Sequence, residues 1–456
     1  MPTNTLQPDH IKLIDVSEEN TLFFHTRTLQ IYPIHDQDIL SFLKTYQEKG
    51  YYQTKKEYPA EDFHELYDFI CKTIKKAPQL TNMEYPDLQT ENFNTVILPI
   101  SAGCNLNCPY CFAQTDGGFH FGDFTANDLD RIVSFIIQKQ SDKESPLTLI
   151  FFGGEPLLNV PLIKHTLALF KEKYSDYNVR FSITTNGTLL NDEIIRMFKE
   201  HNFAVLVSLD GYDNEFNLRR FKNGKSSVGT VVKNIGRLKE NGIFTEIRAT
   251  LVNSNPFIVE TIHFLEEQEV PYSAIFAYTS ENKSHHLADY DADSLASIRS
   301  QLDNLLAYYI DRVKKNEPIR NKMFGEVLPV LRFRVNKKIP CGAGVGFFTV
   351  TANGDIYSCA HLMNESRYKI GTVASGITDK SGYIPVAIDK IEECKACWAR
   401  YLCLGGCPSQ KISMGGRNDS KKGEFECELE RLMWIFYIRL YYHLMNLAPG
   451  YLKESE

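Results

Sequence analysis

Residues 104–111 read Cys-Asn-Leu-Asn-Cys-Pro-Tyr-Cys and follow a strand predicted at 95–100. Three thiolates within eight residues can hold one face of a four-iron cubane, because each binds a different iron and the loop turns back on itself. Cys104, Cys108 and Cys111 then leave the fourth iron open, which suits an enzyme that chelates a substrate. A structural zinc site is the alternative, but zinc requires a fourth ligand nearby. The spacing favours a catalytic iron-sulfur loop.

Around this loop the sequence alternates between strands and helices. Strand patterns fall at 95–100, 147–152, 179–184, 204–209, 246–251 and 272–278, with helical periodicity between them. Six such repeats predict an α/β fold with a parallel sheet, either open or curved into a partial barrel. In both cases we expect the chemistry at the carboxyl ends of the strands.

Glycine and polar residues follow the next three strands at that edge. Gly153, Gly154 and Glu155 come after the second strand, residues 184–187 close the third, and residues 208–211 close the fourth. Alone, Gly-Gly-Glu is equally the pattern of a turn with a solvated glutamate. Together with the cysteine loop, the Gly-Gly-Glu pattern favours one binding site to which all of these strand ends contribute.

The cysteine loop and these strand ends resemble the radical SAM superfamily, whose signature places an aromatic residue, here Tyr110, before the last cysteine. The resemblance implies a partial (β/α)6 barrel over residues 93–316 that binds a [4Fe-4S] cluster and S-adenosyl-L-methionine. Glycines would let the backbone approach the methionine ammonium, Glu155 would offset its charge, and Arg219 or Arg220 would meet the carboxylate. The implied cofactor contacts are Tyr110, Gly153, Gly154, Glu155, Thr184, Asn186, Ser208, Asp210, Arg219 and, at the adenine, Leu251.

A second cysteine group occupies residues 341–430. Its members are Cys341, Cys359, Cys394, Cys397, Cys403, Cys407 and Cys427. This pattern resembles the SPASM extension of radical SAM enzymes, which holds two auxiliary [4Fe-4S] clusters, and would bring the total to three. The resemblance assigns Cys394, Cys397, Cys403 and Cys427 to a distal cluster. It leaves Cys341, Cys359 and Cys407 for a proximal cluster with an open iron. Two zinc ribbons are the alternative.

The residue after Cys359 narrows the function. Sulfatase-maturing relatives place an aspartate there, thought to act as a base, whereas this sequence has Ala360. The resemblance therefore argues against sulfatase maturation.

The N-terminal segment reads as a module of its own, residues 1–80. Short strands are predicted at 11–16, 21–25 and 29–32, followed by a helix that ends at Gly50 and a helix at 60–76. The pattern resembles the winged-helix-like recognition element of enzymes that modify ribosomally made peptides. A sheet edge would take up the leader of a precursor peptide by strand addition. An unrelated cap on the barrel is the alternative.

The remaining boundaries follow from composition. Residues 81–92 read as a linker, 317–340 as a bridging region with little periodicity, and 431–456 as a packed helix and polar tail. The net charge of −7 argues against a nucleic-acid partner, and no segment is apolar over the length of a membrane span. Eleven cysteines without an export signal belong in a reducing cytoplasm. Cys71 is expected to be an ordinary core thiol.

Together these patterns predict a radical SAM peptide maturase. The preferred product is a thioether between a cysteine sulfur and a carbon of the precursor peptide, with flavodoxin or ferredoxin as reductant. A carbon-carbon crosslink, an epimerised residue, sulfatase maturation and a non-catalytic electron carrier are the alternatives.

Overall fold

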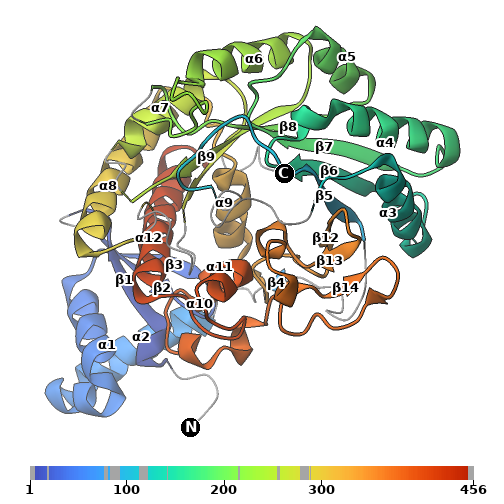
Figure 1. Ribbon diagram of the computed structural model, residues 1–456. Helices are drawn as coiled ribbons and strands as arrows, with labels where there is room; N and C mark the ends of the chain where they lie inside the picture. Colours follow the sequence, from blue (N-terminus) through green and yellow to red (C-terminus); the bar gives the residue numbers. More distant parts are fainter. Residues whose placement is uncertain are drawn as a thin grey trace.

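A ten-stranded sheet forms the centre of the computed structural model (Figure 1). Its strand order is β10-β9-β8-β7-β6-β5-β12-β13-β14-β15. The structure describes residues 6–17, 20–75, 81–82, 93–111, 122–140, 142–213, 216–253, 257–277, 287 and 289–449. Most of the predicted linker and the end of the polar tail lie outside these residues.

The six strands predicted from the alternating pattern are confirmed, and neighbours among them pair in parallel. Figure 1 shows the sheet bent into a crescent, with the helices between the strands in an arc on its outer side. The sequence left two alternatives, an open sheet and a sheet curved into a partial barrel. The structure shows the curved sheet. The strands are β5 (Thr95–Ser101), β6 (Leu147–Gly153), β7 (Val179–Thr185), β8 (Ala204–Ser208), β9 (Thr245–Leu251) and β10 (Tyr272–Phe276). The helices are α3 (Ala126–Lys139), α4 (Val160–Lys173), α5 (Asp192–Glu200), α6 (Val228–Glu240), α7 (Ile258–Glu267) and α8 (Ala292–Lys314).

The cysteine-rich region continues this sheet on the far side of β5. Strand β12 (Phe347–Val350) pairs in parallel with β5, and Phe348 stacks on Phe93 with ring centroids 4.3 Å apart. Since β5 leads into the first cysteine loop, this pairing places both cysteine regions next to the same strand. The short elements that follow are β13 (Asp355–Tyr357), β14 (Gly371–Thr372), β15 (Gly376–Ile377), α10 (Arg400–Cys403) and α11 (Pro408–Ser413).

The N-terminal strands form a separate antiparallel sheet, β1 (Ile11–Asp15), β2 (Thr21–His25) and β3 (Gln30–Ile34). Phe23 and Ile11 pack with the helices that follow. From the other face, Leu22 and Phe24 join the main core, and the Phe24 ring lies 6.1 Å from that of Trp398. The module therefore shares its core with the cysteine-rich region, which sequence periodicity did not reveal.

The predicted helix end at Gly50 is confirmed, because its φ of 74° and ψ of 179° are not helical. A second helical stretch follows this kink directly, and the label α1 (Gln37–Glu57) covers both stretches. Beyond the kink, the Thr54 hydroxyl donates to the Gly50 carbonyl at 2.8 Å, and Tyr51 packs on Phe63 of α2 (Ala60–Lys75). Glycine is the usual helix terminator, but here tertiary contacts hold the next turn in place.

Two further helices extend beyond the predicted boundaries. The bridging region contains α9 (Met323–Phe333), which was not predicted. Pro329 lies inside this helix, and proline disfavours a helix interior. Helix α12 (Glu424–Leu447) begins before residue 431, so that Cys427 lies in its first turn. Within the described residues, no helix is both long and apolar enough to cross a membrane.

Candidate active site

The loop with Cys104, Cys108 and Cys111 is held from two sides. The Asn107 N–H donates to the Arg220 carbonyl at 2.8 Å, and the Asn105 amide donates to the Thr188 hydroxyl at 2.8 Å. Burial raises the pKa of the Cys108 thiol to about 12. The two asparagines therefore anchor the loop to the segments that follow β7 and β8, a role the sequence analysis did not predict.

Gly153 and Gly154 bring the end of β6 against this loop. A Cβ at Gly153, whose φ is 140°, would lie 2.3 Å from the Ser101 carbonyl oxygen. A Cβ at Gly154 would lie 2.3 Å from the Gly103 carbonyl oxygen. No side chain fits in either position, so the close approach of the two strand ends requires glycine. The sequence argument invoked approach to a cofactor and did not include this packing.

Glu155 joins the ends of β6 and β7. Its side chain is fully buried, and one carboxylate oxygen accepts hydrogen bonds from the Thr185 hydroxyl at 2.7 Å and the Leu157 N–H at 3.0 Å. The other oxygen accepts from the Asn186 N–H at 2.7 Å. Both oxygens of Glu155 are therefore engaged by groups of the protein, and its expected contact with the methionine ammonium stays a prediction. The hydroxyl beside it comes from Thr185, whereas Thr184 is half-buried.

The burial of Glu155 predicts a pH-dependent stability. Burial raises its pKa from 4.5 to about 7, although the hydrogen bonds from Asn186, Thr185 and Leu157 act in the opposite direction. The folded protein therefore holds this proton more tightly than the unfolded chain, and the contribution of Glu155 to stability is lost as the pH rises from about 4.5 to about 7. The shift in pKa corresponds to roughly 3 kcal/mol in the free energy of unfolding.

We expect Glu155→Gln to be more destabilising at pH 5 than at pH 8, because glutamine does not titrate. Calorimetric melting temperatures at several pH values measure this difference. Glu172→Gln, on the exposed side of α4, is the matched control and should show the same difference from wild type at every pH. If the difference in melting temperature between Glu155→Gln and wild type is the same at every pH, the raised pKa of Glu155 is wrong.

Asp210 is the centre of a buried ion pair at the end of β8. It accepts hydrogen bonds from the Arg219 Nε at 2.9 Å, the Thr250 N–H at 2.9 Å and the Tyr110 hydroxyl. The Arg219 guanidinium also lies over the Tyr110 ring, 5.4 Å from its centroid. The Asp210 N–H donates to the Asn217 amide oxygen at 3.1 Å. These contacts join the cysteine loop, β8 and β9 around one carboxylate.

The other predicted cofactor contacts lie along the same edge. Ser208 ends β8 and pairs in register with Arg248 of β9. The Asn186 side-chain amide donates to the side-chain Oδ1 of Asn105 at 2.8 Å and lies 3.8 Å from the Cys104 sulfur. Leu251 has its side chain in the core, so only its backbone is available for a contact with adenine. The role of each residue in binding S-adenosyl-L-methionine stays a prediction.

The resemblance divides the seven C-terminal cysteines into two sets. We call Cys341, Cys359 and Cys407 the proximal set, and Cys394, Cys397, Cys403 and Cys427 the distal set. Burial raises the pKa of Cys359 to about 12, and the neighbouring thiols of Cys407 and Cys341 add to the rise. Burial likewise raises the pKa of Cys403 to about 12, with Cys427 and Cys397 among its neighbours. That these thiols bind iron stays a prediction.

All eleven cysteines are free thiols in the structure. In the part of the chain that the structure describes, no three Cys, His, Asp or Glu side chains converge on a single metal ion.

The buried ammonium of Lys411 tests whether these residues suit iron-sulfur clusters. Its side chain is 3% exposed, and burial lowers its pKa while the thiols of Cys394, Cys403 and Cys407 raise it. Among the described residues no carboxylate forms an ion pair with it, and a buried charge requires a counter-charge. Thiolates bound to iron would supply one, and sulfur is the donor that iron-sulfur clusters use. The donor set and the buried cation both fit such clusters.

The two cysteine regions meet through an apolar cluster. Cys111, Ile97 and Phe152, all from the barrel, pack against it. The cluster consists of Tyr357, Ala360, Leu362, Met363, Tyr368 and Ile412. The first cysteine loop and the cysteine-rich region are therefore direct neighbours.

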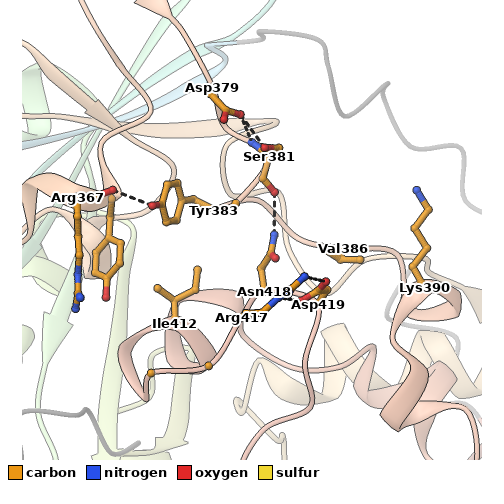
Figure 2. A pocket seen from close by; sticks show the side chains of 14 residues that line it. Arg367, Asp379, Ser381, Tyr383, Val386, Lys390, Ile412, Arg417, Asn418 and Asp419 are labelled. Atoms are coloured by element: carbon orange, nitrogen blue, oxygen red, sulfur yellow. Dashed lines mark hydrogen bonds and ion pairs between the residues drawn. The ribbon is translucent and has the colours of Figure 1, made fainter.

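A cavity of about 840 Å³ lies on the outside of the cysteine-rich region (Figure 2). Tyr383 and Asn418 line it, and the Asn418 amide donates to the carbonyls of Ser381 and Ile384 at 3.0 Å each. None of the site residues predicted from the sequence lines this cavity. Tyr368 and Ile412 of the apolar cluster also line this cavity.

Residues 98–265 match the family model of the Radical SAM superfamily. The chain therefore contains a radical SAM domain, with its cysteine loop and strand-end residues at the edge where the sequence predicted them. This family implies an enzyme that uses S-adenosyl-L-methionine and a [4Fe-4S] cluster.

Comparison with individual proteins extends the likeness beyond that domain. An uncharacterised protein of Methanocaldococcus jannaschii is 32% identical over 194 residues, which cover 42% of this chain and 65% of that protein, slightly less than two thirds. The cysteine-type anaerobic sulfatase-maturating enzyme of Clostridium novyi is 27% identical over 376 residues, which cover 76% of this chain and 97% of that enzyme.

Two solved structures share the fold. The structure of anSMEcpe with bound AdoMet has a TM-score of 0.63 and 19% identity, and the match covers 79% of this chain and 97% of that one. The structure of Streptococcus suis SuiB has a TM-score of 0.51 and 17% identity, with 91% and 98% covered. The SuiB match covers the larger share of this chain.

Proposed function

We propose that this chain is a radical SAM maturase that modifies a peptide or protein substrate and holds three [4Fe-4S] clusters. One observation carries the proposal: the first cysteine loop and the cysteine-rich region meet at the carboxyl end of β5. A radical formed at the first would lie close to an electron acceptor at the second. The sequence similarity to a sulfatase-maturating enzyme over most of its length supports a polypeptide substrate.

The chain's own residues have distinct tasks in this reaction. When bound by Cys104, Cys108 and Cys111, a [4Fe-4S] cluster supplies the electron that cleaves S-adenosyl-L-methionine to methionine and a 5′-deoxyadenosyl radical. Asp210 fixes Tyr110, and with it the cysteine loop, against the ends of β8 and β9. Glu155 fixes the end of β7. These buried contacts hold the reacting groups in place, which is the main contribution a protein makes to cofactor chemistry.

The finer proposal is that the product is a thioether. The proximal set offers three thiolates for a four-iron cluster, and a cysteine of the substrate peptide is a suitable fourth ligand because metal binding deprotonates it. In forming the thioether, one S–H and one C–H bond break and one S–C bond forms. One hydrogen leaves in 5′-deoxyadenosine, and the other leaves as a proton and an electron. The electron goes to a one-electron acceptor of the iron-sulfur class.

Sulfatase maturation is the second candidate, favoured by the similarity to the Clostridium novyi enzyme. The position after Cys359 argues against it, because Ala360 is buried in the apolar cluster and supplies no base. A peptide of the sulfatase type, offered beside the precursor peptide, distinguishes the two functions.

The N-terminal sheet is the proposed site for a leader peptide. Its order is β1-β2-β3, so β1 and β3 are edge strands at which an extended peptide can add. The module has the three strands and following helices of the recognition elements it resembles. Flavodoxin or ferredoxin as reductant and a cytoplasmic location complete the proposal.

Mass spectrometry of the anaerobic reaction tests the thioether. The substrate offered is a short cysteine-containing precursor peptide, with its cysteine-to-serine variant as control. We expect the peptide to lose two hydrogens and its cysteine to resist alkylation, and we expect the serine variant to remain unmodified. A modified peptide with freely alkylatable cysteine would disprove the thioether and leave the radical SAM assignment standing.

A further inference from the structure

Lys411 is a buried cation between the two cysteine sets. It lies on α11, four residues after Cys407 of the proximal set, and its side chain is 3% exposed. Its Nζ donates to the Asn418 carbonyl at 2.6 Å. A Cβ built on Gly405, in the turn that joins Cys403 of the distal set to Cys407, would lie 3.8 Å from this Nζ. The ammonium is therefore beside the one short segment that connects the two sets.

A second buried lysine shows what is unusual about Lys411. Lys422 packs over the adjacent Gly406, and its Nζ donates to the Glu430 carboxylate at 2.6 Å. Glu430 neutralises that charge. Lys411 has a backbone carbonyl as its hydrogen-bond partner and no ion pair among the described residues. Thiols of both sets, the Lys422 ammonium and the Asp419 carboxylate lie within electrostatic reach of it.

Asn418, which lines the cavity and whose carbonyl accepts from Lys411, holds the ammonium in position. Figure 2 shows Asn418 turned toward Ser381, where its amide donates to the Ser381 carbonyl at 3.0 Å. It also donates to the Ile384 carbonyl at 3.0 Å. Asn418 is itself buried, so the carbonyl that accepts from Lys411 belongs to a fixed loop. The ammonium cannot turn away to solvent without breaking this loop.

A fixed positive charge favours the more negative state of a nearby redox group. Reduction adds one negative charge to an iron-sulfur cluster, and local charge and hydrogen bonds set its potential. Burial strengthens the interaction because water does not screen it. We propose that Lys411 raises the reduction potentials of the clusters on both the proximal and distal sets. The raised potentials make these clusters better acceptors for the electron that leaves the substrate. This inference rests on the three-cluster part of the proposed function.

Anaerobic redox titration followed by electron paramagnetic resonance tests it in the full-length, iron-reconstituted protein. In Lys411→Met we expect the ratio of reduced to oxidised auxiliary cluster, at a fixed applied potential, to fall about tenfold, which is a shift of about 59 mV for one electron. The cluster of Cys104, Cys108 and Cys111 should keep its potential and serves as an internal reference. Lys390→Met removes the same charge from the exposed rim of the cavity and should shift the auxiliary clusters much less.

A charge-retaining variant separates electrostatics from packing. Lys411→Arg should keep both the iron content and the potentials of the wild type. If Lys411→Met shifts the auxiliary potentials no more than Lys390→Met, or if Lys411→Arg shifts them as far as Lys411→Met, the inference is wrong. If Lys411→Met fails to assemble its clusters, Lys411→Arg decides alone: a shift of the auxiliary potentials larger than that of Lys390→Met overturns the inference. Iron near four per wild-type chain would instead refute the three-cluster proposal and this inference with it.

Discussion

Replacing Cys104, Cys108 and Cys111 together by alanine is expected to abolish cleavage of S-adenosyl-L-methionine. These thiols are the proposed ligands of the cluster that supplies the electron, and the loop that carries them lies at the end of β5. Formation of 5′-deoxyadenosine under anaerobic reducing conditions should fall to background. Iron should drop from about twelve to about eight atoms per chain, because one four-iron cluster of three is lost.

Cys71→Ala is the matched control for this experiment. Cys71 packs at the edge of the N-terminal core, far along the chain from both cysteine regions, and should be dispensable for iron and for cleavage. Undiminished 5′-deoxyadenosine from the triple variant would rule out these three cysteines as the catalytic set. Loss of all iron would show instead that the loop is needed to fold the cysteine-rich region it touches.

Replacing Asp210 by alanine is expected to destabilise the protein by roughly 3–5 kcal/mol, the cost of leaving a buried charge without its partner. Arg219 would keep its guanidinium inside the protein, and the Tyr110 hydroxyl and the Thr250 N–H would each lose an acceptor. Denaturant unfolding of the cofactor-free protein measures the effect. Because Tyr110 belongs to the cysteine loop, affinity for S-adenosyl-L-methionine should fall as well.

Asp311→Ala provides the comparison for an exposed ion pair. Asp311 pairs with Lys315 at 2.7 Å one helical turn away, and both side chains are more than half exposed. Such pairs contribute about 0–1 kcal/mol. Equal destabilisation by the two substitutions would mean that the buried network around Asp210 does not hold the site together.

Local sequence determined much of this protein. The six parallel strands follow from alternating runs of apolar residues, and the cysteine loop follows from its own spacing after β5. Thr125 caps α3 with Asp128 in a capping box, another signal contained in four residues. The two cysteine sets were also predicted, through resemblance to a known pattern. Each of these features depends on residues close in sequence or on their spacing, so it can be recognised without knowledge of the fold.

Tertiary structure decided the features that depend on burial and on distant partners. Glu155 becomes a buried junction only because Thr185 and Asn186 come from another strand. The second helical stretch of α1 follows Gly50 directly because Tyr51 packs on Phe63 of α2, a contact that local propensity does not determine. The charge of Lys411 matters because the fold removes it from water beside thiols of both cysteine sets. The physical reason is the same in all three cases: the energy of a charge or a turn depends on its surroundings, which are assembled from segments far apart in the chain.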